Sequence, residues 1–123
     1  MPRLLEWEQL QEDVRIVLEE IDGRSKISRG SGAVKGNGDV TSNNYMVECK
    51  YRSTDSFSIN RDTFRKIQEE AALLGKIPAL ATRNKKKETL ITLSLKDFIK
   101  AVNVLTAEGR RDYGNSPSPS ELY

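Results

Sequence analysis

Three ionisable residues in the middle of the chain have a spacing that suits metal-dependent chemistry. Asp39 is followed by Glu48 and then by Lys50. In a β-strand, residues i and i+2 point to the same face, so Glu48 and Lys50 would project together. Two carboxylates on adjacent strands offer the hard oxygen ligands that Mg²⁺ prefers, and a lysine beside them can orient a water or neutralise charge on a phosphate. The pattern suggests metal-dependent phosphodiester hydrolysis, the alternative being a surface salt bridge between Glu48 and Lys50.

Strands and a turn are predicted around these residues. Residues 39–41 are predicted to form one strand, and residues 42–44 (Ser-Asn-Asn) the turn of a hairpin. Residues 45–52 alternate cleanly and are predicted to form the central strand. Val47 and Cys49 would face away from Glu48, so the thiol of Cys49 is interpreted as a buried structural group.

The rest of the chain predicts an α/β domain. Hydrophobic periodicity indicates helices at about residues 4–21, 61–74 and 95–105. Further strands are expected at residues 26–29, 77–82 and 89–95, with a brief extension at 57–59. The order is α-β-β-β-α-β-β-α, a mixed five-stranded sheet flanked by helices. Residues 1–105 would form one domain, and the Ser/Pro-rich residues 106–123 a flexible tail.

Each helix should bury one apolar stripe. The first stripe is predicted to contain Leu10, Val14, Val17, Leu18 and Ile21, and the second Phe64, Ile67, Ala71 and Leu74. Asn60 or Ser58 is expected to cap the second helix, and Gly75 to follow its end.

Composition excludes several classes of site. The chain of 123 residues has no histidine, which excludes Ser-His-Asp hydrolysis and most catalytic zinc sites. A single cysteine excludes a disulfide framework and a cysteine-based zinc cluster. No apolar run reaches transmembrane length and no signal-peptide pattern opens the chain, so a cytoplasmic protein is expected. A basic surface around an acidic centre would suit a polyanion.

A glycine-rich segment precedes the first acid. Residues 30–38 contain four glycines in nine positions, and such a segment is predicted to form a loop. Close approach of the backbone to a phosphate would justify the entropic cost of these glycines. A plain connector is the alternative.

The motif Gly38-Asp39 followed by Glu48-Cys49-Lys50 resembles the PD-(D/E)xK nuclease superfamily, whose core pattern is an acid at a strand start and then acid-x-lysine on the next strand. The preceding residues 29–32 (Arg-Gly-Ser-Gly) are similar to the small-residue loop of archaeal-type (Hjc-like) Holliday junction resolvases and their phage relatives. Residues 51–80 also resemble those phage proteins. The likeness spans roughly residues 4–105, with Gly38 standing where the family often has proline.

The resemblance implies a restriction-endonuclease-like fold and a phage-encoded enzyme of the host cytoplasm. The implied activity is a Mg²⁺-dependent endodeoxyribonuclease, with Mn²⁺ as a substitute, that resolves four-way DNA junctions. Two symmetric cuts in branched double-stranded DNA imply a homodimer. The alternative is another nuclease of the superfamily without junction specificity: a nicking enzyme, a restriction-like enzyme or a recombination exonuclease.

The resemblance also implies roles for particular residues. Asp39 and Glu48 would hold the metal with the carbonyl of Cys49, and Lys50 would position the attacking water or stabilise the phosphate. In the resolvases a first-helix glutamate completes the site, and counting back from Gly23 identifies Glu12. Helical arithmetic places Glu12 opposite the apolar stripe, so Gln11 and Glu8 stay as alternatives. The implied DNA contacts are Arg29, Gly30, Ser31, Gly32, Lys35, Arg52 and Lys66.

Overall fold

The computed structural model describes residues 4–28 and 37–112. The elements are α1 (Glu6–Asp22), β1 (Lys26–Ser28), β2 (Asn37–Thr41), β3 (Tyr45–Tyr51), α2 (Arg61–Leu73), β4 (Ile77–Arg83), β5 (Thr89–Thr92) and α3 (Leu95–Asp112). This order confirms the predicted α-β-β-β-α-β-β-α arrangement.

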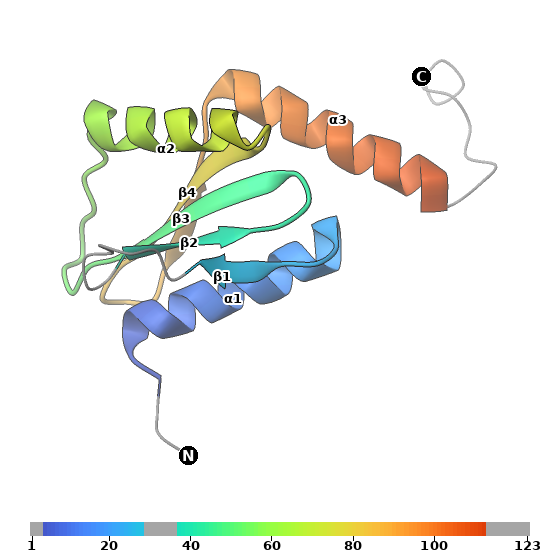
Figure 1. Cartoon of the computed structure of the whole chain (residues 1–123). Helices are drawn as coiled ribbons and strands as arrows, with labels where there is room; N and C mark the ends of the chain where they lie inside the picture. The colour runs from blue at the N-terminus through green and yellow to red at the C-terminus, as the bar shows by residue number, and fades with distance from the viewer. Residues whose placement is uncertain (1–3, 29–36, 113–123) are drawn as a thin grey trace, which may run out of the picture.

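The five strands form one mixed sheet in the order β1-β2-β3-β4-β5. Neighbouring strands are antiparallel except for β3 and β4, which are parallel and are joined through α2. Helices α1 and α2 lie on opposite faces of the sheet (Figure 1). Side chains therefore alternate along β3 between a face under α1 and a face under α2.

The face under α1 holds most of the core. Leu10, Val14 and Leu18 of α1 are buried in one cluster with Val47 and Cys49 of β3. The predicted first stripe is too wide, because Val17 is 52% exposed and Ile21 is 41% exposed. Both side chains line a groove between α1, the sheet and α3 instead of packing under the helix.

The face under α2 is smaller. Ile67 and Ala71 of α2 are buried, as are Met46 of β3 and Leu80 of β4. The helix begins at the predicted cap, since Asn60 Oδ1 accepts a hydrogen bond of 2.8 Å from the backbone N–H of Thr63.

Helix α2 ends at Leu73, and Gly75 follows with a φ of 64°. Leu74 lies beyond the last turn and is 58% exposed, so its predicted burial is wrong.

Two predicted boundaries are also wrong. Residues 57–59 form no strand, and α3 continues to Asp112 instead of ending at Leu105. Residues 106–112 contain good helix formers, and the prolines that would stop a helix stand only at positions 117 and 119. The remainder of the predicted tail, residues 113–123, lies outside the described residues. None of the helices in the described part combines the length and apolar character needed to cross a membrane.

The end of α1 is tied to the turn between β2 and β3. Asp22 is only 2% exposed, and its carboxylate accepts hydrogen bonds from the Ser42 hydroxyl and, at 2.6 Å each, from the backbone N–H and the side-chain amide of Asn44. Gly23 follows with a φ of 85°, and a Cβ there would lie 2.5 Å from Asn43 Nδ2. This anchor fixes the hairpin turn and, through it, the register of β2 on β3.

Candidate metal centre

The β2–β3 hairpin brings the two predicted carboxylates together. Asp39 pairs directly with Glu48 in the antiparallel ladder, and directly opposed residues project to the same face of a sheet. That face is the one covered by α2, because the next residue, Cys49, points into the core under α1. The pair thus arises from hairpin register, as its spacing predicted.

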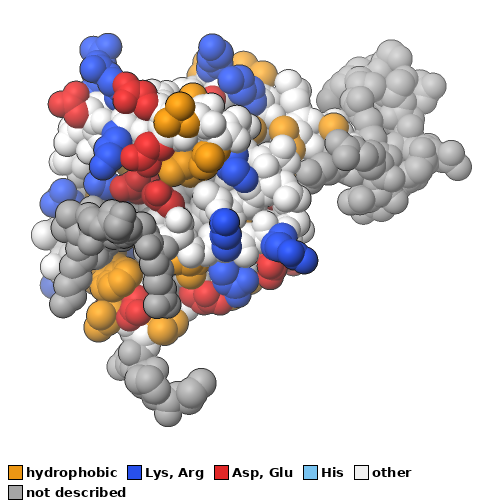
Figure 2. Space-filling view, in the orientation of Figure 1, with side chains coloured by type: hydrophobic (Ala, Val, Ile, Leu, Met, Phe, Trp, Pro, Cys, Tyr) orange, Lys and Arg blue, Asp and Glu red, His pale blue; other side chains and the backbone are white. Residues whose placement is uncertain are grey.

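A third carboxylate, Glu70, comes from α2. Carboxylate oxygens of Asp39, Glu48 and Glu70 all lie within 4.8 Å of one another, and the three residues are half-buried. Glu70 stands three residues after Ile67 and one before Ala71, so it lies at the edge of the helical face that packs on the sheet. Acidic side chains gather between α2 and the strands, with basic side chains beside them (Figure 2).

The environment of Glu48 disfavours its charged form. Burial raises its pKa to about 7, and the charge of Asp39 and a hydrogen bond between the two carboxyl groups act in the same direction. The charge of Glu70 makes the smallest contribution to this raised pKa. Without a cation, the pair therefore retains a proton near neutral pH.

The donor set fits a small divalent cation. Oxygen ligands on opposite sides of one Mg²⁺ lie about 4.2 Å apart, twice the usual Mg–O distance of about 2.1 Å. Adjacent ligand oxygens lie about 3.0 Å apart, so the three carboxylates, whose oxygens lie within 4.8 Å of one another, would move closer together around a bound cation. Three carboxylates around a retained proton form a site at which a cation can replace the proton.

Lys50 lies beside this group. It projects from β3 to the same face as Glu48, it is half-buried, and its positive charge acts to lower the pKa of Glu48. The predicted common projection of Glu48 and Lys50 is therefore observed. An ammonium group next to a carboxylate cluster combines a cation site with a fixed positive charge.

Cys49 is 1% exposed, and burial raises the pKa of its thiol to about 12. This confirms the interpretation of a buried structural thiol. The role of its backbone carbonyl in metal binding stays a prediction.

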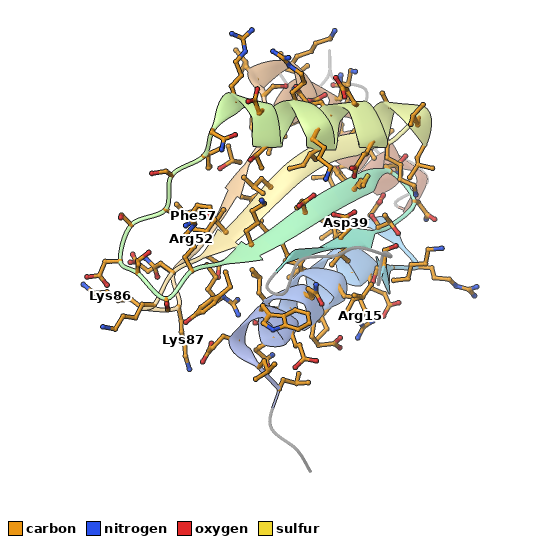
Figure 3. All side chains as sticks on the ribbon, turned by 60° about the vertical axis from the view of Figure 1, so that its left-hand side comes forward. Arg15, Asp39, Arg52, Phe57, Lys86 and Lys87 are labelled. Carbon is orange, nitrogen blue, oxygen red and sulfur yellow. The ribbon has the colours of Figure 1, made fainter. Side chains whose placement is uncertain are left out.

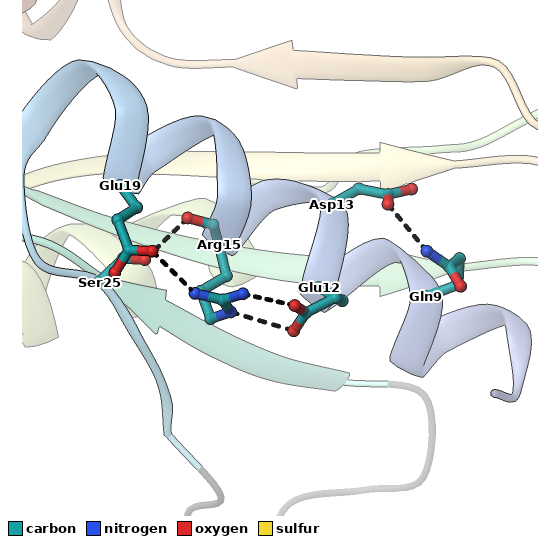
Figure 4. A network of polar contacts seen from close by, with 6 residues as sticks. All are labelled: Gln9, Glu12, Asp13, Arg15, Glu19 and Ser25. Carbon is teal, nitrogen blue, oxygen red and sulfur yellow. Dashed lines mark hydrogen bonds and ion pairs between the residues drawn. The ribbon is translucent and has the colours of Figure 1, made fainter. Parts of the chain in front are cut away.

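The structure does not bring Glu12 to the three carboxylates. Its carboxylate forms two hydrogen bonds with the guanidinium of Arg15, one of them 3.0 Å from Arg15 Nε, and this pairing lowers the pKa of Glu12 (Figure 4). Of the two alternatives, Gln11 is buried, and Glu8 accepts a hydrogen bond of 3.0 Å from the N–H of Leu5. Glu70 supplies the third carboxylate, which counting along the first helix missed.

The predicted DNA contacts are only partly described. Arg29, Gly30, Ser31, Gly32 and Lys35 lie outside the described residues. Arg52 is exposed just after β3, with its guanidinium carbon 5.1 Å from the centre of the Phe57 ring (Figure 3). Lys66 is exposed on α2, one turn before Glu70.

The third ligand can be tested by comparing two glutamates. We expect Glu70→Gln to weaken Mg²⁺ binding by about tenfold or more, because the candidate site would lose one of its three carboxylates. Glu12→Gln should leave the affinity unchanged, because Glu12 pairs with Arg15. Isothermal titration of the metal-free proteins with MgCl₂ measures both. Weaker binding in Glu12→Gln alone would restore the first helix as the source of the ligand.

No protein-family model matches this chain, and no curated protein matches it.

Proposed function

We propose that this protein is a Mg²⁺-dependent nuclease that hydrolyses phosphodiester bonds in DNA. One observation carries the proposal: the carboxylates of Asp39, Glu48 and Glu70 converge within 4.8 Å on the face from which Lys50 projects. The chain has no histidine, so phosphodiester chemistry here would depend on carboxylates and lysine.

The negatively and positively charged residues would have different roles. The three carboxylates would hold the cation, which when bound would contribute positive charge at the scissile phosphate and acidify water. Lys50 would orient the attacking water or neutralise the charge that develops on the phosphate. The carbonyl of Cys49 would add an oxygen ligand from the same strand.

We further propose a restriction-endonuclease-like fold and four-way DNA junctions as the substrate. The mixed five-stranded sheet, with the acids on adjacent strands and a helix connecting β3 to β4, supports the fold. The sequence resemblance of the motif and of residues 29–32 to junction resolvases supports the substrate. Arg52, Lys66 and the residues of the glycine-rich segment would contact the DNA backbone.

Junction resolution would require two active sites, so we propose a homodimer. Exposed apolar side chains on the face opposite the carboxylates support it. They surround a groove of about 430 Å³ and include Val17, Ile21, Ile91, Phe98 and Leu105. A second copy could cover this face and leave both acidic sites open. Sedimentation at micromolar concentration should give a dimer mass, and a stable monomer would contradict the resolvase proposal.

Cleavage of a four-way junction tests the function directly. We expect paired cuts in a labelled junction with Mg²⁺, and none with EDTA, because the carboxylates cannot organise the reaction without a cation. Linear duplex of matching sequence should be cut at least about tenfold more slowly. Equal cutting of both substrates would favour a nuclease without junction specificity. No cutting of either substrate would overturn the nuclease proposal.

A further inference from the structure

The side chain of Asn84 forms several hydrogen bonds in and around the turn between β4 and β5. Asn84 Oδ1 accepts hydrogen bonds of 3.0 Å from the backbone N–H groups of Lys86 and Glu88. Asn84 Nδ2 donates to the carboxylate of Glu88 at 3.0 Å and to the carbonyl of Asp55 at 3.1 Å. Residues 84–88, named the lysine turn below, are thus preorganised and joined to the loop that follows β3.

This rigid turn presents three adjacent positive charges to solvent. Lys85, Lys86 and Lys87 are exposed, and no ion pair found among residues 4–28 and 37–112 includes any of them. The acid within the turn, Glu88, accepts from Asn84. Such a cluster presents a positively charged patch that attracts an anion such as a phosphate.

The backbone of Lys87 adds a second sign of a binding role. Its φ is 65°, a left-handed conformation that favours glycine. A lysine here keeps a charge at the tip of the turn at the expense of backbone strain, a pattern typical of functional sites.

The lysine turn lies beyond the C-terminal end of β3, the strand that carries Glu48 and Lys50. Tyr51 at the end of β3 pairs with Arg83 at the end of β4, and the backbone N–H of Lys85 donates a hydrogen bond of 3.0 Å to the carbonyl of Thr54. Figure 3 shows Lys86 and Lys87 at the same end of the molecule as Arg52. At about 3.3 Å per residue, the lysines lie roughly 15–20 Å beyond the carboxylates, or about five base pairs of B-form DNA.

We propose that the lysine turn binds the sugar–phosphate backbone of a duplex DNA arm about five base pairs from the bond that is cut. This inference rests on the proposed function, because the carboxylate site defines where the arm begins. A duplex that lies over the carboxylates and runs along β3 passes the turn. The turn contributes affinity and leaves the chemical step to the carboxylates and Lys50.

Two matched double variants test the proposal. Lys85→Gln/Lys86→Gln removes two charges from the turn. Lys96→Gln/Lys100→Gln removes two charges beside Ile77 and Pro78, at the opposite end of β4. Binding of a labelled four-way junction is measured in EDTA over a series of salt concentrations. Only the turn variant should lose about tenfold in affinity at 0.1 M salt, and the slope of log affinity against log salt should become shallower by about one to two.

A third variant separates binding from folding. Lys87→Gly should weaken junction binding, yet raise or preserve the melting temperature, because glycine adopts a φ of 65° without strain. For all turn variants, the cleavage rate at saturating enzyme should stay within about twofold of wild type.

The possible failures are distinct. If wild type binds and cuts DNA but the turn variant matches the Lys96/Lys100 control in affinity and salt slope, the lysine turn is not a DNA contact and the nuclease proposal stands. If wild type binds no DNA, the proposed nuclease function is wrong, and the proposed role of the lysine turn falls with it.

Discussion

Asp39→Asn is expected to lower the rate of Mg²⁺-dependent DNA cleavage by roughly a thousandfold or more. Asparagine has the same shape as aspartate but lacks the anionic charge that, with Glu48 and Glu70, would hold the cation. Glu48→Gln should have an effect of the same size for the same reason. Lys50→Ala should also abolish cutting, because it removes the positive charge beside the carboxylates.

Single-turnover cleavage of a labelled junction at saturating enzyme measures these effects on the chemical step alone. DNA affinity in EDTA should be retained or slightly increased in the Asp39 and Glu48 variants, because each variant removes a negative charge that repels the phosphate backbone. Glu12→Gln and Lys96→Ala are controls that alter charge away from the site and should cut at the wild-type rate. Near wild-type cleavage by any of the three site variants would show that the site is assigned wrongly.

Glu48→Gln is also expected to stabilise the metal-free protein at pH 8, by about 1–2 kcal/mol after allowance for the partial exposure of the group. The pKa of Glu48 is raised from 4.5 to about 7 in the folded chain. Below pH 4.5 the carboxyl group is protonated in both the folded and the unfolded states, so its charge has no effect on stability. Between pH 4.5 and 7 the carboxyl group of Glu48 is ionised in the unfolded state but still protonated in the folded state, so the free energy of unfolding of wild type falls as the pH rises. Above pH 7 the group is ionised in both states, and the free energy of unfolding falls no further on its account.

Urea unfolding in EDTA at several pH values measures this difference. The advantage of Glu48→Gln over wild type should grow from pH 4.5 to 7 and then level off. Glu12→Gln should show the opposite sign, because Arg15 lowers the pKa of Glu12 and its charge stabilises the fold. A difference between Glu48→Gln and wild type that does not vary with pH would contradict the environment described for Glu48.

Magnesium should make wild type more stable than Glu48→Gln, the reverse of the order expected without metal. A cation that binds the folded state stabilises it by mass action, so Mg²⁺ should raise the melting temperature of wild type at pH 8 and have much less effect on Glu48→Gln. The effect on wild type should weaken as the pH falls below 7, because protons then compete with the cation for Glu48.

Local pattern was enough to predict the central part of the site. The side chains of a strand alternate with a period of two, and residues 42–44 close a tight turn, so Asp39 and Glu48 had to meet if the hairpin formed. The same alternation placed Lys50 beside Glu48 and Cys49 in the core. The order of helices and strands followed equally from periodicity and turn residues, which act over short stretches of chain.

The third carboxylate depended on contacts between distant segments. Glu70 meets Asp39 and Glu48 only because α2 connects two parallel strands and packs across them. Its spacing from Ile67 and Ala71 showed which helical face it shares, but not which part of the sheet that face would cover. Glu12, in contrast, was chosen by counting along α1, which lies on the other face of the sheet, and there it pairs with Arg15.

The sequence by itself thus determined the element order, the Asp39–Glu48 hairpin and the position of Lys50, because each depends on residues close together in the chain. The tertiary structure alone decided that Glu70 completes the carboxylate group, that Val17 and Ile21 border a groove, and that Asn84 joins the lysine turn to the carbonyl of Asp55. These features depend on how elements pack, and packing is set by the summed burial of many residues rather than by any local pattern.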